Sequence, residues 1–170
     1  MLDKVPDFQK IGRQLIVDAQ TIAEVEMINF VMANFEKQGF LDSTLQPWEQ
    51  RKNDEDHGRA ILTKTAGLRD SIKITQSSTK RVAVGSNAKH AKIHNEGGII
   101  TIPVTAKMRK FFWYKYKETG QQRYKSMALT KKTHFTIKMP KRQFMGNSVT
   151  FNDIIDAKFK KMIIQRFKAL

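Results

Sequence analysis

The sequence predicts an α+β fold, in which a small and mainly antiparallel sheet packs against a long N-terminal helix and a C-terminal helix. Three observations support this prediction. Apolar residues recur every three or four positions near both ends of the chain. Short segments between these ends alternate polar and apolar residues, as half-buried strands do. A basic, aromatic segment separates the last two strands, so we expect an arm at about residues 104–132, inserted in a single domain of residues 1–170.

The composition fits a folded protein. With 170 residues, of which 40% are hydrophobic, the chain can bury one core and is short for two domains. It has no cysteine, which excludes disulfides, thiolate catalysis and cysteine-bound zinc. The N-terminus lacks the basic start and apolar run of a signal peptide, and no stretch approaches about 18 apolar residues. We therefore expect synthesis in the cytoplasm and no membrane partner.

A long first helix is expected from Phe8 to Glu36, because its apolar residues form one continuous stripe. Gly39 is a suitable stop for this helix. Residues 42–58 are polar and are expected to form a loop, which includes the acidic run at residues 54–56. Within this loop, Trp48 is expected to anchor the chain on the core.

The remaining elements follow from turn residues, caps and local periodicity. They are a helical turn at residues 67–71, strands at 72–75 and 81–85, a helix from Ser86 or Asn87 to about Glu96, strands at 99–103 and 133–139, and a final helix capped by Asn152-Asp153. Within the arm, we expect a first helical part to end at Gly120 and a second one to follow it. A proline ends each of the last two strands, so strand pairing should stop there.

The net charge of +15 is concentrated in one segment. Residues 107–142 carry twelve Lys or Arg and a single acid, Glu118, whereas residues 1–106 are nearly neutral. A functional interpretation must therefore explain this segment.

The first half of the arm combines that charge with aromatic rings. The candidate partner-binding residues are Arg109, Lys110, Phe111, Phe112, Trp113, Tyr114, Lys115, Tyr116 and Lys117. Five rings so close together cannot all point inward from one helix, so some are exposed or covered by a partner. We expect the rings to make apolar contacts, and we expect the cations Arg109, Lys110, Lys115 and Lys117 to align the arm by charge on an acidic partner or on passing DNA.

Three interpretations of the arm remain open. It can be an assembly arm, with its rings buried against a neighbouring subunit and its lysines facing acidic surface there. It can bind nucleic acid, with cations on phosphates and rings stacked on bases. Finally, the rings can belong to the chain's own core, with the lysines as a solvated face.

The sequence offers no catalytic set, so we expect neither an enzyme nor a cofactor. His90 and His94 stand four residues apart and could share a metal ion on one helix face. They lack a third ligand, and Ala91 stands where a zinc-protease motif needs glutamate. A zinc-dependent hydrolase is thus a minor alternative, which predicts bound zinc. We expect His94 instead to hold backbone groups near the Gly97-Gly98 turn.

A series of short motifs runs through the middle of the chain. They are Trp48 with Arg51, Ile61-Leu62 through Thr65 to Gly67-Leu68, Ser71-Ile72, Val84-Gly85, His94 with Gly97, and the group Pro140, Arg142, Phe144 and Gly146. In order and spacing, over about residues 45–150, this series resembles the phage virion morphogenesis family of tail completion proteins. The chain departs from the family at His90-Ala91, where the family often has Tyr-Ala, and in its long basic arm.

The resemblance implies a structural virion protein, made in the bacterial host cytoplasm by a phage or prophage. Such a subunit completes the tail and joins it to the head, in a ring of copies. Its partners would be other copies of the chain and phage tail or connector proteins, with non-specific DNA contact as a possible addition. The motif residues would then be structural.

Overall fold

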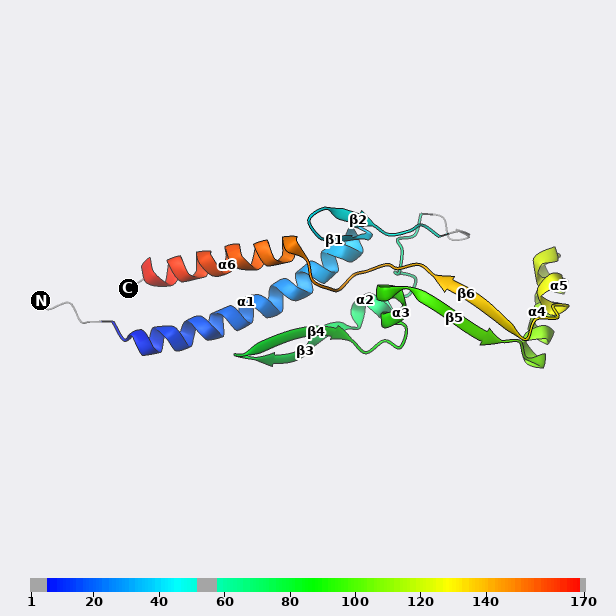
Figure 1. Cartoon of the computed structure of the whole chain (residues 1–170), viewed down its shortest axis with the longest axis horizontal. Coiled ribbons are helices and arrows are strands. Elements are labelled where there is room, and N and C mark those ends of the chain that lie inside the picture. The colour runs from blue at the N-terminus through cyan, green and yellow to red at the C-terminus, as the bar shows by residue number, and fades with distance from the viewer. Residues whose placement is uncertain (1–5, 52–57, 169–170) are drawn as a thin grey trace, which may run out of the picture. The chain divides into compact units, whose positions relative to one another are not determined.

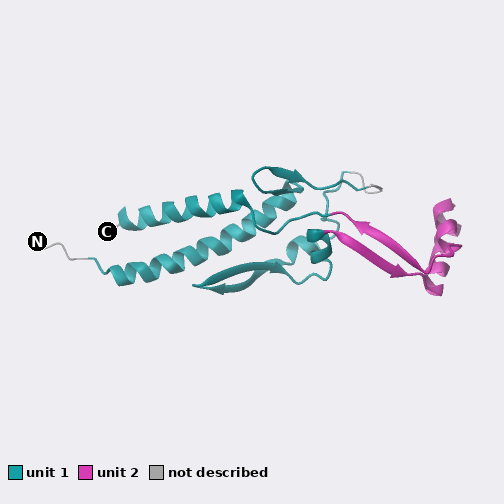
Figure 2. Cartoon of the chain, viewed as in Figure 1, with its two compact units in different colours: residues 1–96, 141–170 teal, residues 97–140 magenta. Residues whose placement is uncertain are grey.

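The computed structural model describes residues 6–51 and 58–168, so the acidic run at residues 54–56 lies outside the described part. It confirms the α+β fold with long helices at both ends of the sequence (Figure 1). The chain forms two compact units (Figure 2). Unit 1 comprises residues 1–96 and 141–170, and unit 2 comprises residues 97–140.

Unit 1 holds most of the helices and strands, and unit 2 holds the arm with the two strands that carry it. The elements of unit 1 are α1 (Phe8–Glu36), β1 (Gly39–Leu41), β2 (Leu45–Pro47), α2 (Gly67–Asp70), β3 (Ile72–Ser78), β4 (Arg81–Ser86), α3 (Ala91–Glu96) and α6 (Val149–Lys168). Those of unit 2 are β5 (Gly98–Pro103), α4 (Ala106–Thr119), α5 (Gln122–Ala128) and β6 (His134–Met139). Among the described residues, the strands form three separate antiparallel pairs, β1–β2, β3–β4 and β5–β6.

Helix α1 has the predicted bounds, and its start is set by a cap. The side chain of Asp7 accepts a hydrogen bond from the Lys10 N–H at 2.9 Å, which satisfies one of the free amides of the first turn. Burial is confined to the end of the helix, at Phe30, Val31, Asn34 and Phe35. The last two turns of α1 therefore anchor the core.

Several predicted boundaries were wrong. Residues 39–41 form β1, where we expected only a stop for the first helix, and β3 ends at Ser78 instead of residue 75. Residues 45–47 pair with β1 as β2 instead of lying in a loop. Helix α3 begins only at Ala91, because the Ser86 hydroxyl accepts from the Ala88 N–H in a preceding turn. Helix α6 begins at Val149, before the expected cap, because the Ser148 hydroxyl accepts from the Phe151 N–H.

Aromatic rings fill the centre of unit 1. The ring of Phe35 lies edge-on to Trp48, at 5.5 Å between centroids, and tilted against Phe144 at 5.1 Å. Phe144 is fully buried, and Ile61 and Leu68 complete the same cluster. Burying three large rings together supplies much of the apolar area of this small core.

Residues 142–145 form a segment without helix or strand that runs through this core; we call it the buried crossing. Its backbone groups are hydrogen-bonded by side chains. The side-chain amide oxygen (Oδ1) of Asn95 accepts from the N–H groups of Phe144 (2.9 Å) and Met145 (3.0 Å). The Asn34 amide donates to the Phe144 carbonyl at 3.2 Å, and its oxygen accepts from the Leu41 N–H at 3.0 Å. Two amide side chains thus replace the partners that a sheet would supply.

Helices α1 and α6 run antiparallel and side by side in unit 1 (Figure 1). Asp18 pairs with Arg166, and Glu26 pairs with Lys158 at 3.2 Å, so two ion pairs stand two turns apart along each helix. Hydrogen bonds from Gln14 and Arg166 lower the pKa of Asp18. No residue of α6 is fully buried, which leaves much of the apolar side of this helix pair open.

We predict that Asn34→Ala lowers the free energy of unfolding by about 2–4 kcal/mol. The Leu41 N–H and the Phe144 carbonyl lose their hydrogen-bond partner, and each buried group left unpaired costs about 1–3 kcal/mol. The measurement is urea unfolding, with the exposed Asn87→Ala as a matched control that should change stability by less than about 0.5 kcal/mol. Equal stability of the two variants would show that the buried crossing does not depend on Asn34.

Candidate functional site

The predicted structural motif gathers around the buried crossing. The indole N–H of Trp48 donates to the Gln143 carbonyl at 2.7 Å. The Arg142 guanidinium donates twice to the Glu49 carbonyl, at 3.0 and 2.8 Å, and the Arg142 N–H donates to the His94 carbonyl. Burial lowers the pKa of the Arg142 guanidinium, although the Glu49 carboxylate acts in the opposite direction. Through these hydrogen bonds, Trp48 and Arg142 connect segments of the chain that are distant in sequence.

The other motif residues set turns and close approaches. The Ser71 hydroxyl donates to the Leu68 carbonyl at 2.6 Å and meets the Ser86 hydroxyl, so it joins the ends of β3 and β4. A Cβ on Gly85 would lie 2.8 Å from a methyl carbon of Thr75, which leaves no room for a side chain. The remaining positions mark ends of elements: Gly67 starts α2, Gly97 has a positive φ of 74° after α3, Pro140 follows β6, and Gly146 follows the buried crossing.

The two neighbouring histidines contact each other. The rings of His90 and His94 lie edge to face, 5.6 Å apart. Burial, and then the charges of His90 and Arg142, lower the pKa of His94. We expected the His94 side chain to hold backbone groups of the Gly97-Gly98 turn, but its Nδ1 has no hydrogen-bond partner among the described residues. The His94 carbonyl instead accepts from the Arg142 N–H in the buried crossing. No group of three metal-ligating side chains occurs in the described part of the chain.

Unit 2 is a strand pair that carries two helices. Strands β5 and β6 pair from Gly98–Met139 to Pro103–His134, and the Val104 N–H then donates to the Thr133 carbonyl at 2.8 Å. The Thr105 hydroxyl accepts from the Met108 N–H and caps α4. Gly120, in the left-handed conformation, ends α4 as predicted, and α5 follows.

One side of α4 packs within unit 2. Phe112 stacks on Tyr124 of α5 at 6.3 Å and lies edge-on to Phe135 of β6 at 6.1 Å. The Arg109 guanidinium donates to the carbonyls of Ala128, at 3.0 Å, and Thr130, so it binds the end of α5. Phe112 and Arg109, which are both candidate partner-binding residues, therefore hold the arm together.

The opposite side of α4 is open. Residues three and four apart on a helix share a face, and Lys110, Trp113, Tyr114 and Lys117 do so here. Together with Lys107 and Phe111 they are exposed, and we call this set the outer face of α4. The exposed fractions of Phe111, Trp113 and Tyr114 are 51%, 36% and 61%. Three large rings thus remain in contact with solvent, between lysines.

Tyr116 lies on the same side of α4 as Arg109 and Phe112, and Lys115 lies at the edge of that side. The Lys115 ammonium binds Glu118 at 2.6 Å, and this hydrogen bond raises the pKa of Lys115. The ring of Tyr116 lies edge-on to Trp113 and 5.7 Å from the Lys125 ammonium. The single acid of unit 2 is therefore already paired with one of its ten Lys and Arg residues.

Sequence reasoning missed several residues that the structure shows to matter. Asn34 and Asn95 were not singled out, because an isolated amide carries no pattern of its own. Tyr124 and Phe135, which pack on Phe112, lie in other elements and could be found only from the fold. The division of α4 into two sides could have been predicted from helical spacing alone.

Comparison with known proteins gives one clear match. The model of the phage virion morphogenesis family matches residues 18–160, most of the chain. The chain belongs to this family, and its role is structural or in assembly of the phage particle. The family is not known for enzymes, and membership implies a virion-associated protein. No curated protein and no solved structure matched. Among the described residues, no helix is long and apolar enough to cross a membrane.

We predict that Phe112→Ala speeds amide hydrogen exchange in α5 about tenfold, because α5 loses its aromatic contact with α4 and opens more often. Tyr114→Ala is the matched control, since it removes an exposed ring from the same helix and should leave exchange in α5 unchanged. Equal effects of the two substitutions would contradict the division of α4 into an inner and an outer side.

Proposed function

We propose that this protein completes the phage tail and joins it to the head, as a ring of copies in which unit 2 supplies contacts to neighbours. Membership of the phage virion morphogenesis family supports a role in the assembly of a phage particle. The observation that carries the proposal is the outer face of α4, where three exposed rings stand between lysines that have no ion pair among the described residues.

The chemistry of unit 2 suits an interface. Aromatic residues are enriched at the centres of protein interfaces, where they bury large areas at little cost in conformational entropy. Unit 2 exposes seven large hydrophobic residues, which are Ile99, Phe111, Trp113, Tyr114, Met127, Leu129 and Ile137. The two helices and two strands of unit 2 do not cover these seven side chains, so a partner that covers them would stabilise unit 2.

A ring needs one heterologous interface, repeated around an axis. An arm that reaches from each subunit to the next provides such an interface, which in stable complexes buries about 1,200–2,000 Å² in total. Lysines around the aromatic contact would orient it against acidic surface, because complementary charge fixes register and speeds association.

The proposal predicts that replacing residues 105–132 with Asn-Gly leaves unit 1 folded but abolishes the joining of heads to tails. The Val104–Thr133 hydrogen bond holds the two strand ends together, so a two-residue turn can close them. The readouts are thermal unfolding of the purified chain and electron microscopy of particles from a phage that lacks the native chain and is supplied with the variant.

Normal joining by this variant would contradict the proposal. An unfolded variant would instead show that the arm is part of the core. A triple substitution, Phe111→Ser with Trp113→Ser and Tyr114→Ser, separates these outcomes, because it keeps the inner side of α4 and should lower joining as strongly as the replacement does.

Nucleic-acid binding by unit 2 is the second candidate function. Ten basic residues against one acid, with exposed rings among them, also suit phosphates and bases. In this case, affinity for a generic DNA duplex should fall with salt, with a log–log slope of about 0.9 for each phosphate neutralised. Lys110→Gln combined with Lys117→Gln should then lower the slope by about 2. A flat salt dependence would rule this function out.

A further inference from the structure

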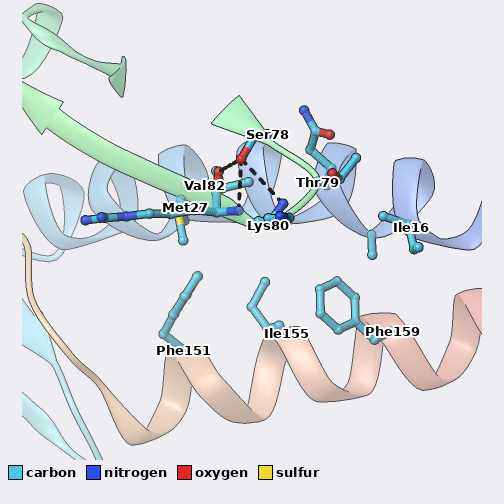
Figure 3. A pocket seen from close by; sticks show the side chains of 13 residues that line it. Ile16, Met27, Ser78, Thr79, Lys80, Val82, Phe151, Ile155 and Phe159 are labelled. Carbon is cyan, nitrogen blue, oxygen red and sulfur yellow. Dashed lines mark hydrogen bonds between the residues drawn. The ribbon is translucent and has the colours of Figure 1, made fainter. Parts of the chain in front are cut away.

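Unit 1 contains an apolar groove that the proposed function does not use. It has a volume of about 420 Å³ and lies between α1, the turn from β3 to β4, and α6 (Figure 3). On one side, Phe151, Ile155 and Phe159 of α6 point toward α1. Such a volume is within the range of about 300–1,000 Å³ that binding pockets occupy.

The groove exists because α1 presents small side chains there. Ala19 and Ala23 form its α1 wall, between the larger Ile16 and Met27. The large side chains of α6 face α1 across the groove, and the turn from β3 to β4 lines its third side. The small side chains of the two alanines leave space at the α1 wall.

The α6 wall continues beyond the groove. Phe151, Ile155, Phe159, Ile163 and Phe167 follow one another at intervals of four residues, which is the spacing of a ridge on a helix surface. The first three line the groove, whereas Ile163 and Phe167 are 42% and 48% exposed. Each step of four residues turns this row by about 40° around α6, so a partner helix can lie beside the part of the row that lines the groove.

The charged residues that line the groove indicate which kind of partner can bind there. Lys80 and Arg81 line the groove, and its described lining residues include no acid. Neither cation forms an ion pair with another described residue. An acidic partner would satisfy both cations, whereas unit 2 of a second copy, with ten Lys and Arg against one acid, would be repelled.

We propose that this groove docks an amphipathic helix of an acidic partner protein. Large apolar side chains at positions i, i+4 and i+7 of that helix enter beside Ala19 and Ala23 and extend along the α6 ridge. Carboxylates on the flanks of the helix bind Lys80 and Arg81. The site differs from the outer face of α4, so it gives the protein a second means of attachment.

The test uses two fluorescein-labelled helical peptides of about 20 residues, both with leucines at i, i+4 and i+7, one flanked by glutamates and the other by lysines. Binding to the full chain is followed by fluorescence anisotropy. The glutamate peptide should bind at least about tenfold more tightly than the lysine peptide. Lys80→Glu combined with Arg81→Glu should reverse that preference.

Ala23→Phe fills the groove and should weaken binding of the glutamate peptide about tenfold, whereas the exposed Ala157→Phe on α6 should not. Thermal unfolding checks that both variants fold. Absence of binding, equal binding of the two peptides, or equal binding by the folded Ala23→Phe variant would overturn the proposal. Self-association of the chain that Ala23→Phe abolishes would also overturn it, because a second copy would then be the occupant.

Discussion

The rest of unit 1 depends on hydrogen bonding of the buried crossing. An extended segment inside a core must find a partner for each buried N–H and C=O, because a group left unpaired costs more than an ordinary contact contributes. Here the partners come from the end of α1, the Trp48 region and α3, through Asn34, Trp48 and Asn95. One segment therefore fixes the positions of three distant parts of the chain.

This arrangement separates stability from recognition. The motif residues are occupied in holding unit 1 together, and Phe112 and Arg109 do the same for unit 2. The outer face of α4 and the apolar groove beside α6 are two surfaces that the described structure leaves open for partners. Both surfaces are basic at their edges, so their partners should be acidic, and the two surfaces should not bind each other.

Much of the fold could be predicted from local patterns. The stripe on α1 gave its bounds, and alternation and prolines located β3 to β6, because these signals depend on neighbours in sequence. The three-residue strands β1 and β2 were both missed because each is too short to show a period. The start of α6 depends on Ser148 and on Asp42, which accepts from the Val149 N–H across more than a hundred residues. Likewise, the packing of Phe112 depends on distant residues, and no sequence pattern records it.

If this chain is a structural component of the phage particle, purified particles should contain it, and quantitative mass spectrometry can measure how many copies they hold. The account predicts a small and fixed number of copies per particle, in constant ratio to a portal or tail-tip protein. Absence from clean particles, with the chain abundant in the lysate, would contradict it. The protein would then be an assembly factor or a nucleic-acid-binding protein instead of a component of the head–tail joint.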